Sequence, residues 1–180
     1  MTTKAYFISA LLSYASIAAT YNYLSSYEVD DLYEIKFSTN RAEGTFTGLT
    51  GVVDFSDSDL ENSMMDVKVE VATIKTGNKT KDKHARNSKW FHSEKYPNIS
   101  YKLESITKIK DNNYQVTGLL TIKDVSEKHT INFSIDKENN YLLGATTVNR
   151  ESFNINGNSL AFLVGEDVTV DLRIPSNYNG

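Results

Sequence analysis

Residues 71–97 read VATIKTGNKTKDKHARNSKWFHSEKYP, and this stretch does most to decide the fold. It follows one strand-like segment and leads into another, from Asn98 to Leu103. Its middle is polar and charged, whereas its end carries the aromatic residues Trp90, Phe91 and Tyr96. These side chains can pack against the domain, so the stretch does not have the character of a disordered linker. A long crossing between strands usually carries function, because rigid strands position it. We expect one or two helical turns within it, between about residues 80 and 93.

On both sides of this crossing, apolar residues alternate with polar ones. The alternation is clearest over residues 67–71, 99–103, 131–135 and 168–174. Such a period of two is typical of strands that are buried on one face and wet on the other. Runs rich in Asn, Asp and Gly separate the segments and predict turns. These runs lie at residues 57–59, 110–113, 137–140 and 154–158.

Regularly spaced strands separated by such turns predict an all-β, antiparallel domain, either a sandwich or a barrel. A barrel is favoured because closure removes exposed strand edges. Glycines inside the strands, at Gly44, Gly48, Gly51 and Gly118, are expected to mark bulges, bends or close approaches. We therefore predict an antiparallel barrel of about eight strands. A barrel of that size either fills its interior or holds one elongated ligand.

The composition excludes several classes of function. At 180 residues the chain suits one domain with a sizeable core. Its net charge of −4 argues against nucleic acid as a partner. The basic run from Lys79 to Arg86 is interpreted as a solvated loop. The absence of cysteine excludes disulfide bonds, thiolate catalysis and cysteine-based zinc sites.

The N-terminus has the pattern of a secretory signal peptide, which we place at residues 1–18. Lys4 supplies a positive charge, an apolar run follows to Ala19, and small residues occupy positions 16–18. The run is too short for a membrane span, and no later segment would span one. Serines within the run leave an N-terminal helix of a cytosolic protein as the alternative.

Motifs for catalysis and metal binding are weak. Gly77–Thr80 has the look of the tail of a phosphate-binding loop, but Ala72 stands where the upstream glycine is needed. His84, His92 and His129 lack the helical spacing of a metalloenzyme and are interpreted as surface or hydrogen-bonded histidines. No nucleophile elbow or carboxylate pair is present. We predict no catalytic residue, no metal site and no cofactor.

Several short motifs share an order and spacing that is more specific than any one of them. They are Tyr27–Asp30, Gly44–Gly51, Ala72–Asn78, Lys81-Asp82-x-His84, Trp90-Phe91, Tyr96-Pro97, Gly118–Ile122, and Val148–Arg150 with Ser152-Phe153. In these motifs the chain resembles the YceI-like proteins, a lipocalin-like group of bacterial isoprenoid-binding proteins. The likeness runs from about Ser26 to Ile174, and we take residues 26–175 as the domain.

The chain departs from the family pattern in three places. Lys81 stands where the family usually has arginine, which removes a planar, bidentate donor. Ala85 stands where leucine is usual. Glu127 replaces a lysine in a turn between strands, and Lys128 follows it.

The resemblance implies a barrel around a long apolar cavity that holds an amphiphile such as a polyprenyl chain, an isoprenoid quinone or a fatty-acid derivative. Each methylene removed from water contributes about 0.8 kcal/mol, so burial of the tail can drive binding. We expect a periplasmic or secreted bacterial protein that binds, and transports or stores, such a lipid. The mature chain would have no stable membrane span, and a homodimer is left open.

Candidate residues follow from the alternation and the resemblance. The expected lining residues are Phe37, Phe46, Phe55, Ile74, Trp90, Phe91, Tyr101, Phe133, Phe153 and Phe162. Lys81, His84 and Arg150 are expected at a polar mouth, where Asp82 either orients a neighbour or caps the loop. Two alternatives remain: a barrel hydrolase or isomerase that uses His84 with Asp82, and a filled, ligand-free stress-response or interaction module.

Overall fold

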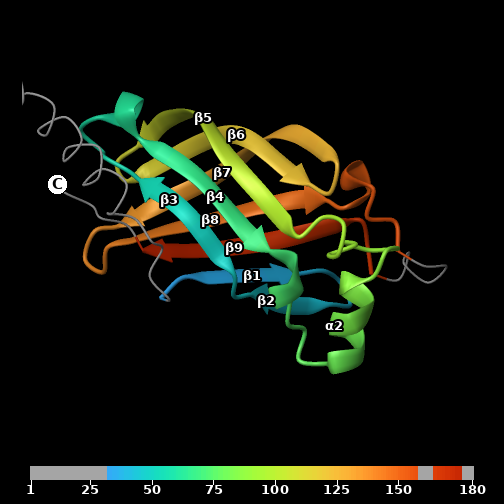
Figure 1. Cartoon of the computed structure of the whole chain (residues 1–180). Helices are drawn as coiled ribbons and strands as arrows, with labels where there is room; N and C mark the ends of the chain where they lie inside the picture. Colours follow the sequence, from blue (N-terminus) through green and yellow to red (C-terminus); the bar gives the residue numbers. More distant parts are fainter. Residues whose placement is uncertain (1–31, 158–163, 176–180) are drawn as a thin grey trace, which may run out of the picture.

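The computed structural model describes residues 32–157 and 164–175, so the predicted signal peptide and Phe162 lie outside the described residues. Within those ranges one antiparallel sheet of nine strands curls around an interior, with a short helix at one end (Figure 1). The strands are β1 (Glu34–Ser38), β2 (Glu43–Phe46), β3 (Leu49–Asp54), β4 (Met64–Glu70), β5 (Asn98–Lys110), β6 (Asn113–Ile122), β7 (Val125–Asp136), β8 (Tyr141–Asn149) and β9 (Asp167–Pro175). The helical segments are η1 (Leu60–Asn62), η2 (Val71–Thr73), α2 (Lys79–Arg86) and η3 (Glu151–Phe153).

The sheet is nearly closed into a barrel. Its order is β2-β1-β9-β8-β7-β6-β5-β4-β3, so β2 and β3 stand at the two edges although only Thr47 and Gly48 separate them in sequence. Beyond this bend, Thr45 and Lys75 exchange two backbone hydrogen bonds of 2.9 Å, which join β2 to the segment after β4. The predicted antiparallel barrel is therefore confirmed. The count is nine rather than about eight, because the bend divides one long segment into β2 and β3.

Glycines permit the closest backbone approaches in this wall. A Cβ atom at Gly44 would lie 2.3 Å from the carbonyl oxygen of Lys75, at the seam of the barrel. A Cβ atom at Gly118 would lie 2.4 Å from the carbonyl oxygen of Lys102 and 2.7 Å from the ring of Tyr101. Both distances are shorter than side chains tolerate, so the strand glycines mark close approaches, as the sequence predicts.

The crossing between β4 and β5 contains the predicted helical turns. Asn78 caps α2, because its side-chain oxygen accepts hydrogen bonds from the backbone N–H groups of Thr80 (2.9 Å) and Lys81 (3.1 Å). Turns follow the helix, and the N–H of Phe91 donates to the carbonyl of Ala85 at 3.0 Å. The crossing therefore lies across the same end of the barrel as the β6–β7 turn. The hydroxyl of Tyr96 donates a hydrogen bond of 2.9 Å to the carboxylate of Asp124 in that turn.

An aromatic cluster closes the other end of the barrel. Phe55 packs edge-to-face on Tyr114, with ring centroids 5.0 Å apart, and on Phe133, with centroids 5.5 Å apart. Behind them, Asp57 accepts hydrogen bonds from Lys108 and from the Tyr114 hydroxyl. These bonds, first that from Lys108, lower the pKa of Asp57 to about 2. We call this group (Phe55, Asp57, Tyr114 and Phe133) the closed end.

Candidate functional site

The interior of the barrel is hollow. Met65, Val67 and Val69 of β4 point inward but are only half-buried, and the inward residues of β9 behave in the same way. In a filled core these side chains would be buried. Because they point inward and are still partly exposed, they must face an internal space. That space is a cavity of about 510 Å³, to which every one of the nine strands contributes lining residues. Its volume lies in the range of typical ligand pockets, about 300–1,000 Å³.

Most of the predicted site residues lie on the wall of this cavity, which is apolar along most of its length. They are Phe37, Phe46, Ile74, Lys81, His84, Trp90, Phe91, Tyr101, Phe133 and Arg150. The rings of Phe46 and Phe91 meet edge-on with centroids 6.1 Å apart, which brings the crossing against β2. Whether any of them contacts a ligand stays a prediction.

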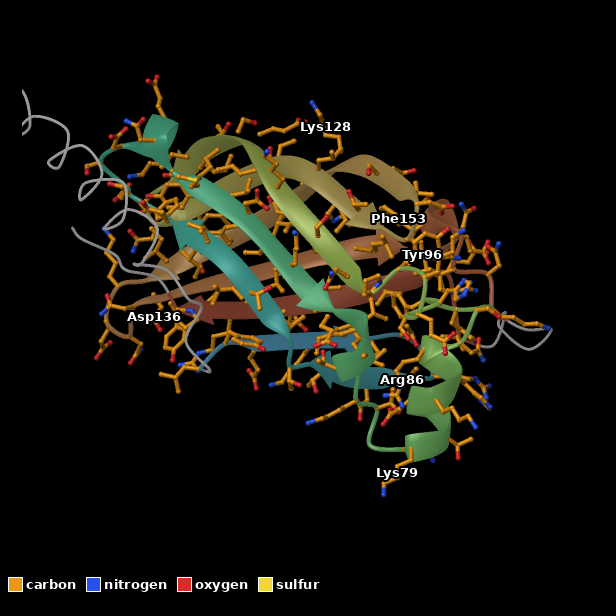
Figure 2. The ribbon with its side chains drawn as sticks, viewed as in Figure 1. Lys79, Arg86, Tyr96, Lys128, Asp136 and Phe153 are labelled. Carbon is orange, nitrogen blue, oxygen red and sulfur yellow. The ribbon has the colours of Figure 1, made fainter. Side chains whose placement is uncertain are left out.

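Two predicted lining residues lie elsewhere. Phe55 is buried within the closed end, and Phe153 is buried in η3, so neither reaches the cavity wall. Figure 2 shows Phe153 at the end of the barrel that carries Tyr96 and α2, with Asp136 at the opposite end. Phe55 directly follows β3, and Phe153 lies in η3 beyond the end of β8, so the inward–outward alternation no longer tells which way either side chain points.

The cavity reaches the surface beside α2. Arg41 in the β1–β2 turn and Lys81 and His84 of α2 are exposed, and yet all three belong to the lining. We call these three side chains the mouth. Lys81 and His84 stand where the sequence predicts them, whereas Arg41 was not predicted. The β1–β2 turn comes close to α2 only because the barrel closes, so no local pattern in the sequence indicates that Arg41 lies at the mouth.

Arg150 has a different surrounding from the one predicted. It is buried, with only 3% of its surface exposed, although it touches the cavity. Its Nε donates to the carbonyl of Gly165 at 2.6 Å, its Nη1 donates to the carbonyl of Ile155, and its Nη2 pairs with Glu151 at 3.1 Å. The guanidinium therefore joins Ile155 to Gly165. Arg150 was predicted at the polar mouth, and the structure places it buried in the cavity wall instead; whether it contacts a ligand stays a prediction.

Asp82 has the capping role that the sequence left as one of two alternatives. Its Oδ1 accepts hydrogen bonds of 2.7 Å from both the backbone N–H and the hydroxyl of Thr76. These bonds, first that from the hydroxyl, lower the pKa of Asp82. Among the described residues, the hydrogen bonds of this carboxylate all go to Thr76, so the structure holds no His84–Asp82 pair of the kind a hydrolase would use.

A polar pair that the sequence interpretation missed lies inside the cavity. His129 of β7 and Thr146 of β8 both line it, and Nε2 of His129 lies 2.7 Å from Oγ1 of Thr146. Burial lowers the pKa of His129. The signal was present in the alternation, because His129 shares a strand face with Ile131 and Phe133.

In residues 32–157 and 164–175, no group of three or more His, Asp or Glu side chains is arranged to hold a metal ion. In the same ranges, no helix has the length and apolar character needed to cross a membrane.

A nearly closed antiparallel barrel around a cavity with a surface mouth defines a lipocalin-like binding barrel. The sequence profile of the YceI-like domain matches residues 27–175, and the chain belongs to the YceI-like family. The predicted family is thereby confirmed.

Relatives and solved structures agree with this membership. A UPF0312 protein of Photorhabdus laumondii is 29% identical over 89 residues, which cover 49% of this chain and 46% of that protein. The chain spans about half the length of the curated relatives it matches, among them Protein YceI of Escherichia coli.

Among solved structures, BcnA of Burkholderia cenocepacia superimposes with a TM-score of 0.77 at 21% identity, over 82% of this chain and 98% of that one. A polyisoprenoid binding domain from Saccharophagus degradans gives a TM-score of 0.60 at 12% identity, over 82% of this chain and 95% of that one. At these identities the two structures establish the fold alone.

Proposed function

We propose that this protein binds one long-chain amphiphilic lipid of the isoprenoid type in its barrel, and carries or stores it without chemical change. The observation that carries the proposal is the apolar cavity of about 510 Å³ that opens beside α2. The solved neighbour from Saccharophagus degradans, described as a polyisoprenoid binding domain, supports the choice of lipid.

The energetics favour a ligand with a long apolar tail. Each methylene that leaves water contributes about 0.8 kcal/mol, so about ten buried methylenes contribute roughly 8 kcal/mol. That free energy corresponds to a dissociation constant in the micromolar range before the cost of ordering the tail. Arg41, Lys81 and His84 would meet the polar headgroup as the lipid passes the mouth.

The proposal includes export. The apolar run and small residues near the N-terminus support a periplasmic or secreted location. N-terminal sequencing of the protein from the native host tests this part, and an intact N-terminus on protein confined to the cytosol would contradict it.

Native mass spectrometry of freshly purified protein tests the binding proposal. We expect one added mass per chain, and organic extraction should release an isoprenoid lipid. Stripped protein should then bind geranylgeraniol, an isoprenoid alcohol that can be added from an ethanol stock. Protein that purifies without lipid and also fails to bind geranylgeraniol or palmitate would refute the proposal.

A further inference from the structure

His129 faces the cavity from the middle of a strand. It lies on β7, on the same face as Ile131 and Phe133, and it pairs in register with Gly118 of β6. The absence of a side chain at Gly118 lets the ring of Tyr101 lie against β6 at this level. The imidazole and the Thr146 hydroxyl thus form a polar pair in a wall that is otherwise mostly apolar.

The single proton of the Thr146 hydroxyl has two acceptors within reach. The carbonyl oxygen of Thr130, at 3.1 Å, can only accept, whereas Nε2 of His129, at 2.7 Å, donates or accepts according to the tautomer of the ring. We assign the hydroxyl proton to the Thr130 carbonyl, so that Thr146 accepts a hydrogen bond from Nε2 of His129. In a neutral ring with its proton on Nε2, Nδ1 is an acceptor.

This Nδ1 lacks a hydrogen-bond partner among the described residues. The neighbouring Tyr101 hydroxyl directs its single proton at backbone carbonyls, to Val116 at 3.2 Å and to His129 itself at 3.1 Å. Burial lowers the pKa of the His129 imidazole, which favours the neutral ring. An acceptor left without a donor in an apolar space costs free energy that a ligand can recover.

We propose that Nδ1 of His129 accepts a hydrogen bond from a hydroxyl group of the bound lipid. The inference rests on the proposed function and narrows it to long-chain neutral alcohols or phenols. An anionic headgroup would not suit this position, because burial of an unpaired charge in an apolar wall is costly. Arg41, Lys81 and His84 stay at the surface and serve the opening.

Matched ligands test the inference. We would measure the affinity of stripped protein for geranylgeraniol and for its methyl ether, which has the same tail but no donor. Nonylphenol and its methyl ether form a second pair that separates phenols from alcohols. The wild-type protein should prefer the hydroxyl form of at least one pair by roughly fivefold. His129→Leu should abolish that preference, whereas Lys128→Leu, at an exposed position of the same strand outside the cavity lining, should keep it.

The possible outcomes separate the two proposals. If wild-type protein binds hydroxyl and ether forms equally in both pairs, the His129 inference is refuted while lipid binding stands. If no member of either pair binds, the proposed function fails, and the inference fails with it.

Nitrogen-15 NMR of the imidazoles keeps the test independent of the folding of His129→Leu. In wild-type protein, Nδ1 of His129 should have the shift of an unprotonated nitrogen, and geranylgeraniol, but not its ether, should move it. A proton on Nδ1, or equal responses to both ligands, would overturn the assignment.

Discussion

Gly144→Leu should stabilise the protein and weaken lipid binding at the same time. Gly144 lies on β8 and lines the cavity. A Cβ atom there would meet Ile131 at 3.4 Å and Leu172 at 3.5 Å, which are ordinary contact distances. A leucine at this position therefore begins without a clash, and its remaining carbon atoms extend into space that the lipid tail would occupy.

The two magnitudes follow from the same carbon atoms. Burial of a leucine side chain contributes about 1.5–3 kcal/mol, less about 0.5–1 kcal/mol of side-chain entropy, so the lipid-free protein should gain about 1–2 kcal/mol. If the leucine excludes about three methylenes of the tail, binding loses about 2.4 kcal/mol, or roughly 60-fold in the dissociation constant.

Two assays measure these changes on stripped protein. Urea denaturation followed by the fluorescence of Trp90, the single tryptophan, gives the free energy of unfolding. Displacement of a fluorescent fatty acid by geranylgeraniol gives the affinity. Ala145→Leu is the matched control, because Ala145 is exposed on the outer face of β8 and should change each quantity by less than about 0.5 kcal/mol. A stable Gly144→Leu protein with wild-type affinity would show that the tail does not lie beside Gly144.

Two further predictions concern the wall and the closed end. Gly118→Ala should lower the free energy of unfolding by about 2–3 kcal/mol, because its Cβ would lie 2.4 Å from the Lys102 carbonyl oxygen; a loss below 1 kcal/mol in urea denaturation would contradict this. Asp57 should stabilise the fold fully above its ordinary pKa of 3.8, and this stabilisation, about 1–2 kcal/mol, should disappear as the pH falls toward about 2. Asp57→Asn should lack that acid-dependent loss, and parallel pH profiles of the two proteins would exclude the role given to this carboxylate.

The sequence predicted which residues face the interior of the barrel, but it did not predict whether that interior is filled or hollow. Alternation is a local property, so it identified inward residues such as Phe37, Tyr101 and Phe133 correctly. The same pattern describes a filled and a hollow barrel alike. The half-burial of Val67 and its neighbours, which reveals the cavity, depends on the distance to the opposite wall and not on any local spacing.

The misplaced residues have a common physical cause. Phe55 and Phe153 lie beyond strand ends, and Arg41 lies in a turn, so tertiary packing alone sets their directions. Arg150 was predicted at the polar mouth, but its guanidinium is buried and donates to the carbonyl groups of Ile155 and Gly165. For His129 the local signal was present but was not used. Its position in the alternation indicated an inward side chain, but a histidine is polar and was therefore not counted among the lining residues.

The aromatic cluster behind Phe133 lies at one end of the barrel, and the exposed lining residues Arg41, Lys81 and His84 lie at the other. If the proposed lipid enters beside α2, it would leave by the same route, so that loading and release would be the forward and reverse of one movement. The length of the barrel would then limit how much of a chain it covers, and a longer chain would extend past α2. A donor and an acceptor of the lipid would each have to approach that end of the molecule.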